Sequence, residues 1–197
     1  MWKKLILVCS PPASGKTYIS RQLATNLHHV VYLDKDTLVP LSNVAFDVCN
    51  LPRMREGGFF EKNLRNVEYD VILDFAFEAL KYDDIVLINA PFTQEIRDTE
   101  YINSLRQKLK DNFNAKLVVI WVETSPEIIK KRMIERNSPR DKYKLLDWDK
   151  YNASVDYSIP ENLNNPEVKD DLLIFHNDTE EEYNKSMTDI LHILEEE

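Results

Sequence analysis

The stretch Ser10-Pro11-Pro12-Ala13-Ser14-Gly15-Lys16-Thr17 decides the fold of this chain, because the apolar run Leu5–Cys9 precedes it and a helical pattern follows it. A loop that cradles phosphate needs inward-turned backbone N–H groups, a helix N-terminus behind them, a lysine for the β and γ phosphates, and a hydroxyl for Mg²⁺. Gly15, Lys16 and Thr17 supply these features. The alternative is an ordinary Ser-Pro-Pro turn with surface residues after it, which the flanking strand and helix disfavour. We therefore predict a nucleotide-phosphate loop.

One position of this loop departs from the pattern G-x-x-x-x-G-K-[ST], because Ser10 stands where the first glycine is expected. That glycine relaxes the turn that leaves the strand. Ser10 must therefore adopt backbone angles that a side chain tolerates, or the turn must differ slightly.

Apolar runs rich in valine, isoleucine and leucine alternate with longer amphipathic stretches along the chain. This alternation is typical of parallel strands joined by helices and buried on both faces, so we predict an α/β fold with a single sheet. The expected strands are Lys4–Cys9, Val30–Asp34, Ile85–Asn89, Lys116–Val122 and Leu172–Phe175.

Helical spacing marks three further stretches as core-facing helices. The last of them begins with Thr179 and Glu182, a capping-box pair, and should close the sheet. The apolar stripes are Ile19, Leu23 and Leu27, then Leu64, Val67, Val71 and Phe75, then Tyr183, Met187, Ile190, Leu191 and Leu194. We expect one domain over 1–197, in which the weakly periodic segment 37–59 is a loop-rich insertion or flap.

The chain is acidic, with 25 Lys plus Arg against 34 Asp plus Glu among 197 residues. A net charge of -9 disfavours an extended nucleic-acid surface or an anionic membrane as partner. No stretch approaches the roughly 18 apolar residues that a membrane span needs. Cys9 and Cys49 form neither a metal spacing nor a disulfide framework, so each is expected to be a small core residue. We expect a cytoplasmic protein.

Two carboxylates, Asp34 and Asp36, end the second expected strand. The carboxyl ends of strands in an open parallel sheet form the ligand crevice, so both acids should face the phosphate loop. Such a carboxylate can take the proton of an attacking hydroxyl or hold Mg²⁺. We assign Asp36 as the base and Asp34 as a metal or structural partner. The alternative is that one or both simply cap the next turn.

The third strand ends at Asn89, where many phosphate-loop proteins carry an aspartate that orders the water around Mg²⁺. An amide can still accept a hydrogen bond from such a water but carries no charge, so the metal would depend on Thr17, Asp34 or Asp36 instead. Phe92 is expected to be a packing residue, with stacking on an acceptor as the alternative.

Three arginines follow the fourth strand. Arg132 and Arg136 lie one turn apart on a helix that begins near Pro126, and Arg140 follows Pro139 on the loop beyond. Arginines at the edge of a phosphate crevice can stabilise the charge of a transferring phosphoryl group. The alternative is a solvated helix face with acidic partners.

These residues together resemble the P-loop kinase family in its small-kinase branch, which includes shikimate and gluconate kinases, zeta toxins and polynucleotide 5'-kinases. The likeness rests on Gly15-Lys16-Thr17, on Leu33-Asp34-Lys35-Asp36, and on Arg132 with Arg136. It is closest to the AAA-type ATP-binding proteins of the polynucleotide 5'-kinase and zeta-toxin type.

The resemblance implies a three-layer P-loop NTPase fold with a five-stranded parallel sheet in the order 2-3-1-4-5. It implies ATP with Mg²⁺ as donor, Asp36 as the family's base, Arg136 as its lid arginine, and Arg132 on adenine or phosphate. The loop His176-Asn177-Asp178 falls where such kinases complete the adenine pocket. Segment 37–62 would be the acceptor-side flap and 132–145 the lid.

The expected site residues fall into three groups. The nucleotide binders are Pro12, Ala13, Ser14, Gly15, Lys16, Thr17, Tyr18, Arg132 and Asn177. The catalytic residues are Lys16, Asp36, Arg132, Arg136 and Arg140, and the metal ligands are Thr17 and Asp34.

Two functions fit this pattern. The first is an ATP-dependent phosphotransferase acting on a hydroxyl of a small molecule, a nucleotide or a nucleic-acid end, in which Arg53 and Arg55 either grip an anionic group or are ordinary surface charges. The second is an ATP-binding switch module with little or no transfer, in which bound ATP orders a lid that faces a partner. The sequence leaves the acceptor and the oligomeric state open.

Overall fold

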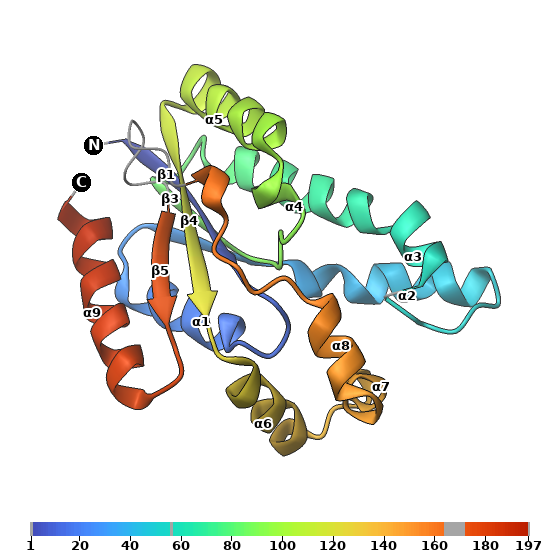
Figure 1. Ribbon diagram of the computed structural model, residues 1–197. Coiled ribbons are helices and arrows are strands. Elements are labelled where there is room, and N and C mark those ends of the chain that lie inside the picture. Colours follow the sequence, from blue (N-terminus) through green and yellow to red (C-terminus); the bar gives the residue numbers. More distant parts are fainter. Residues whose placement is uncertain (1, 56, 164–171, 197) are drawn as a thin grey trace.

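A computed structural model of the chain describes residues 2–55, 57–163 and 172–196. Its sheet is parallel throughout, in the order β2-β3-β1-β4-β5, with β1 at the centre (Figure 1). The strands are β1 (Lys3–Cys9), β2 (Val30–Asp34), β3 (Ile85–Asn89), β4 (Ala115–Glu123) and β5 (Leu172–His176). The predicted strands, their single sheet and the order implied by the resemblance are confirmed, with ends that differ by one residue at most.

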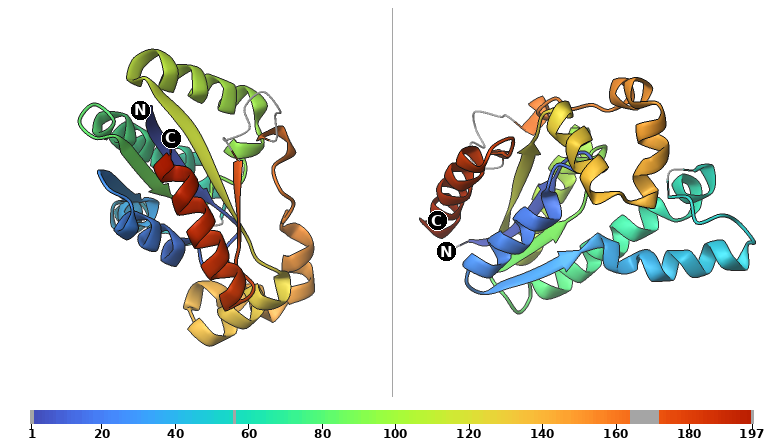
Figure 2. Two further views of the ribbon diagram at one scale, coloured as in Figure 1. Left: turned by 90° about the vertical axis from the view of Figure 1, so that its left-hand side faces the viewer. Right: turned by 90° about the horizontal axis from the view of Figure 1, so that it is seen from below.

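Helices cover both faces of the sheet (Figure 2). The α-helices are α1 (Lys16–Asn26), α2 (Val39–Val48), α3 (Gly58–Asn63), α4 (Arg65–Ala79), α5 (Thr99–Phe113), α6 (Pro126–Arg136), α7 (Lys142–Leu146), α8 (Trp148–Ser154) and α9 (Glu180–Glu196). The 3₁₀ turns are η1 (Lys35–Leu38), η2 (Glu95–Arg97), η3 (Pro139–Asp141) and η4 (Glu161–Leu163).

The alternation of side chains along β1 divides the core between these two faces. Leu5 and Leu7 belong to the cluster that α4 and α5 cover, whereas Ile6 and Val8 belong to the cluster that α1 and α9 cover. All four are fully buried. Burial on both faces explains why the sequence of β1 is a continuous apolar run. Because β1 is the central strand, its carboxyl end lies in the middle of one edge of the sheet.

Capping residues mark both ends of α5 and the start of α9. The Asp98 carboxylate accepts hydrogen bonds from two backbone N–H groups at the start of α5, and Asn114 ends that helix in the left-handed conformation at φ 50°. At α9, the Glu182 N–H donates to Thr179 Oγ1 while the Glu182 carboxylate accepts from the Thr179 N–H, as the capping box predicts. These caps fix where α5 begins and ends and where α9 begins.

Two expectations about helices are wrong. The first part of segment 37–59 is not loop-rich, because residues 37–48 are helical and belong to η1 and α2. The stripe assigned to α4 does not face the core throughout, since Val67 and Phe75 are 55% and 52% exposed. The buried face of α4 combines apolar side chains with Arg65 and Glu68, so a search for apolar spacing selects the wrong face.

The cysteines differ in environment. Cys9 is fully buried in the core, as predicted, and burial raises the pKa of its thiol. Cys49 is exposed at the end of α2, so its assignment to the core is wrong. Within the described part of the chain, no cluster of three metal-ligating side chains occurs and no helix has the length and apolar character to span a bilayer.

Candidate active site

The phosphate loop joins the end of β1 to α1 and is shaped by two left-handed residues. Gly15 has φ +92° and Ala13 has φ +66°, whereas Ser10 does not adopt a positive φ. A Cβ on Gly15 would lie 2.6 Å from Asn177 Nδ2, so only glycine fits there. Ser10, in place of the first glycine, is fully buried without backbone strain. The loop thus keeps the expected path from strand to helix.

The carbonyl oxygen of Ser14 holds this loop in place. It accepts hydrogen bonds from Thr124 Oγ1 at 3.1 Å, Arg132 Nη1 at 3.0 Å and Asn177 Nδ2 at 2.7 Å. The three donors come from the end of β4, from α6 and from the loop after β5. Because the carbonyl is turned toward these donors, contacts from three distant segments hold the loop geometry.

Lys16, the first residue of α1, lies within the electrostatic reach of the acids on β2 and η1. Burial of its ammonium group lowers the pKa of Lys16, and the negative charges of Asp36 and Asp34 act in the opposite direction. Asp36 exerts the largest of these charge effects. The phosphate loop lysine and the expected base therefore belong to one site.

The two acids differ in what they contact. The Asp34 carboxylate caps η1 by accepting the Asp36 N–H at 3.0 Å, and it also accepts the Tyr32 hydroxyl at 3.0 Å. The Asp36 carboxylate is 60% exposed and lies 3.7 Å from Arg140 Nη1. Asp34 thus orients the turn, whereas the exposed Asp36 carboxylate is paired only with the exposed Arg140 among the ion pairs of the described residues.

Asn89, at the end of β3, lies beside Asp34 in the sheet register. Its Nδ2 donates to Thr17 Oγ1 at 3.1 Å and to the Tyr32 hydroxyl at 3.4 Å. Its Oδ1 is buried and has no hydrogen-bond partner among the described residues. A buried acceptor without a partner beside the Thr17 hydroxyl suits a water of a hydrated Mg²⁺ ion, so the residues present fit the metal.

The three arginines have different partners. Besides its bond to Ser14, Arg132 donates from Nη2 to the Asn177 carbonyl at 2.7 Å. Arg136 forms a bidentate ion pair with Asp141, which is fully buried. Arg140 is 64% exposed and faces Asp36. Arg132 and Arg140 thus reach the site, whereas Arg136 is engaged within the turn that ends α6.

The family model of the AAA domain matches residues 5–156, which include the phosphate loop, both acids and all three arginines. The chain belongs to this family. No curated protein sequence matches it.

Solved structures place this AAA-domain protein among the small P-loop kinase folds. A suspected kinase from Chloroflexus aurantiacus j-10-fl has a TM-score of 0.65 and 21% identity, over 100% of this chain and 98% of that one. A gluconokinase from Sinorhizobium meliloti 1021 has a TM-score of 0.51 and 16% identity, over 98% and 96%. A shikimate kinase from Bacteroides thetaiotaomicron has a TM-score of 0.50 and 12% identity, over 97% and 98%. At these identities the likeness shows the fold alone, and it confirms the resemblance.

Other predicted residues lie around the loop in this AAA-domain protein. Pro12 is half-buried, and Tyr18 is 61% exposed on the first turn of α1, with its ring 5.8 Å from that of Tyr183 on α9. Phe92 is fully buried and contacts the ring of Tyr69, so its prediction as a packing residue is confirmed. Arg53 is exposed and paired with Asp47.

Two residues of the AAA-domain site escaped the sequence interpretation. Tyr32 connects Asp34 to Asn89, and Thr124 supports the Ser14 carbonyl. Tyr32 had a signal, because it lies two positions before Asp34 and therefore on the same face of β2. Thr124 directly follows β4, at the edge of the sheet where ligands bind, but a lone threonine there carries no specific pattern.

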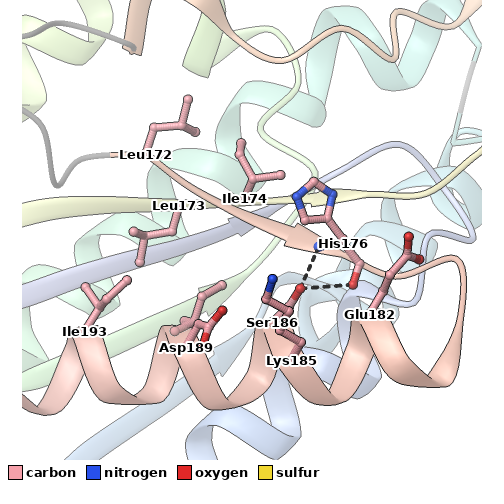
Figure 3. A pocket seen from close by; sticks show the side chains of 10 residues that line it. Leu172, Leu173, Ile174, His176, Glu182, Lys185, Ser186, Asp189 and Ile193 are labelled. Atoms are coloured by element: carbon pink, nitrogen blue, oxygen red, sulfur yellow. Dashed lines mark hydrogen bonds between the residues drawn. The ribbon is translucent and has the colours of Figure 1, made fainter.

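A pocket of about 480 Å³ lies elsewhere, between β5 and α9 (Figure 3). Its lining combines apolar side chains such as Leu173 and Ile193 with His176, whose backbone N–H donates to Ser186 Oγ and whose carbonyl accepts from it. None of the predicted catalytic residues lines it. The site described above therefore does not coincide with this pocket.

Proposed function

We propose that this protein transfers the γ-phosphate of ATP to a hydroxyl group of an acceptor. The carrying observation is that Asp34 pairs with Asn89 in the sheet and Asn89 donates to Thr17 Oγ1, so the turn that carries the exposed Asp36 carboxylate adjoins the phosphate loop. A base and a phosphate-binding lysine within one crevice suit attack by a hydroxyl on a bound phosphoryl group. The AAA domain family and the small-kinase fold support the same reaction class.

In the proposed reaction, the loop amides and the Lys16 ammonium bind the β and γ phosphates of ATP. Asp36 accepts the proton of the acceptor hydroxyl as its oxygen forms a bond to the γ phosphorus. The bond between that phosphorus and the β–γ bridging oxygen breaks, and ADP leaves with the electron pair. We assign adenine to the surface near Tyr18, Arg132 and Asn177.

Mg²⁺, when bound with ATP, would neutralise charge that develops on the phosphates. Thr17 Oγ1 is the candidate ligand, and Asn89 Oδ1 would accept a hydrogen bond from the water shell. Asp34 is already engaged by Tyr32 and the η1 backbone, so we assign it to orienting these groups, with a metal contact through water as the remaining role.

The partners of the arginines suggest a division of labour in the proposed lid, 132–145. Arg140 is exposed and faces Asp36, so it is suited to contact the transferred phosphoryl group. The ion pair of Arg136 with the buried Asp141 makes Arg136 a support for the turn that carries Arg140. Segment 37–62, which contains α2 and α3, would form the acceptor side.

Replacing Asn89 with aspartate is expected to strengthen Mg²⁺ binding in the ATP complex on the order of tenfold, because it adds a negative charge beside Thr17. Calorimetric titration of the ATP-bound protein with Mg²⁺ measures this without turnover. Asn112→Asp makes the same change at an exposed position of α5 and should have no effect. Equal Mg²⁺ affinity in Asn89→Asp and the wild type would remove Asn89 from the metal site.

ADP release tests the proposed function. The protein is incubated with ATP, Mg²⁺ and pools of nucleosides, sugars, sugar acids, antibiotics and oligonucleotides with a 5'-hydroxyl. We expect one pool to raise ADP release well above the rate with ATP alone, and Lys16→Ala to abolish the increase. Tight ATP binding with no stimulation by any pool would favour the switch module instead.

A further inference from the structure

A buried ion cluster adjoins the turn that carries Asp36. Its centre is the Glu68 carboxylate of α4, which is only 5% exposed. Glu68 Oε2 accepts from Lys35 Nζ at 2.8 Å and from Arg55 Nη2 at 2.5 Å, and Glu68 Oε1 accepts from Ser42 Oγ at 2.5 Å. The cluster therefore ties η1, α2 and the connection before α3 to α4.

This cluster contains more positive than negative charge. Two cations, Lys35 and Arg55, share the single carboxylate of Glu68. Burial raises the pKa of Glu68, but the hydrogen bonds from Arg55, Lys35 and Ser42 lower it below its ordinary value, so the group is ionised. The neighbouring described acids are paired with other cations. Glu95 and Glu61 form ion pairs with Arg65, and Asp47 forms one with Arg53. Among the described residues, which do not include Glu56, one positive charge is left over.

Arg55 is the member with unused binding capacity. Its guanidinium carbon lies 4.5 Å from the centre of the Phe60 ring, and its Nη1 is buried with no hydrogen-bond partner among the described residues. Its side chain is 26% exposed, compared with 7% for Lys35. A guanidinium held on an aromatic face with one edge unpaired is preorganised to bind an anion.

The cluster adjoins η1, the turn that carries Asp36, because Lys35 of η1 contacts Glu68. Lys35 precedes Asp36 directly, and its positive charge adds to the effect of burial in lowering the pKa of Lys16. An acceptor whose hydroxyl reaches Asp36 would therefore have its other end near Arg55. Arg53 lies two residues earlier, but its guanidinium is 57% exposed and already bidentate to Asp47.

We propose that Arg55 binds an anionic group of the acceptor, so that the substrate is a hydroxyl compound already carrying a carboxylate or a phosphate. This inference rests on the proposed function, because it names the acceptor class of that same site. The anion supplies a counter-charge that the described residues of the cluster lack, and Glu68 holds Arg55 in position to receive it.

Matched acceptors test the proposal by activity. The panel contains D-glucose, D-gluconate and glucose 6-phosphate, together with cytidine and cytidine 5'-monophosphate, each with ATP and Mg²⁺. We expect the anionic acceptors to be phosphorylated in preference to their neutral counterparts. Whether the carboxylate or the phosphate compound is the better acceptor identifies the anionic group that Arg55 binds. Arg55→Ala should raise the KM of that acceptor roughly tenfold or more while the KM of ATP stays unchanged. Arg55→Lys should recover part of the loss.

Arg53→Ala is the matched control, since it removes the same charge two residues away without touching Glu68. Thermal unfolding of each variant shows whether the α2–α4 region still folds. Preference for neutral acceptors, or an equal KM in Arg55→Ala and the wild type, would overturn the proposal.

A binding measurement separates this inference from the proposed function. The protein is saturated with Mg²⁺ and a non-hydrolysable ATP analogue, and the same acceptors, inorganic phosphate and acetate are titrated by calorimetry. We expect an anionic compound to bind the wild type and to bind Arg55→Ala at least tenfold more weakly. This result without any stimulated ADP release would keep the anion site and refute the transferase. If no anion binds, the anion site is refuted even when transfer to a neutral acceptor is found.

Discussion

Replacing Asp36 with alanine is expected to lower acceptor-stimulated phosphoryl transfer by about 10²- to 10⁴-fold, the range typical of a lost general base. The affinity for ATP should stay within about twofold of the wild-type value. The substitution keeps the hydrogen bond from the backbone N–H of residue 36 to the Asp34 carboxylate, and it removes only an exposed side chain. The change therefore separates catalysis from nucleotide binding.

Single-turnover transfer and ATP calorimetry on the same preparations measure the two effects. Asp47→Ala is the control. Asp47 lies on α2, the helix that follows η1, and its side chain is half-exposed. Among the ion pairs of the described residues it contacts only Arg53. Asp36→Asn preserves the shape and should lose transfer as fully as alanine. Wild-type transfer rates in Asp36→Asn would exclude Asp36 as the base.

A second large effect is expected from Gly15→Ala. The added Cβ would force Asn177 away from the Ser14 carbonyl, and alanine at φ +92° costs roughly 1–2 kcal/mol. For a chain of this size that predicts a fall in Tm of roughly 2 to 8 °C. Displaced loop amides should weaken ATP binding at least about tenfold.

Differential scanning calorimetry and ATP titration check this prediction, with Gly58→Ala as control. A Cβ on Gly58 would meet nothing within 4 Å, and the residue lies in α3, so Tm and ATP affinity should not fall. ATP binding as strong in Gly15→Ala as in the wild type would show that the loop amides do not hold the phosphates as assigned.

The sheet and the phosphate loop could be predicted from the sequence because their signals are local. A strand buried on both faces reads as a continuous apolar run, as Leu5–Cys9 does, and Gly15 with Lys16 and Thr17 occupies adjacent positions. The different contacts of Asp34 and Asp36 became visible only in the structure. Both acids suit a base or a cap, and which one caps η1 depends on backbone direction at a single turn.

Contacts between distant segments could not be predicted in the same way. Glu68 on α4 sits at the centre of a cation cluster, and Asp141 holds Arg136, yet a buried charge has no periodic signature when its partner is many residues away along the chain. The same limit hid the exposure of Val67 and Phe75, because α4 buries charged residues in place of apolar ones.

The Ser14 carbonyl bears on how the protein acquires its binding site during folding. Its three donors lie 110, 118 and 163 residues away along the chain, so their contacts close very long loops. We therefore expect the loop between β1 and α1 to reach its final shape only when the segment that follows β5 is docked. Nucleotide affinity should therefore mature last, and ATP should stabilise the finished protein without assisting its partly folded precursors.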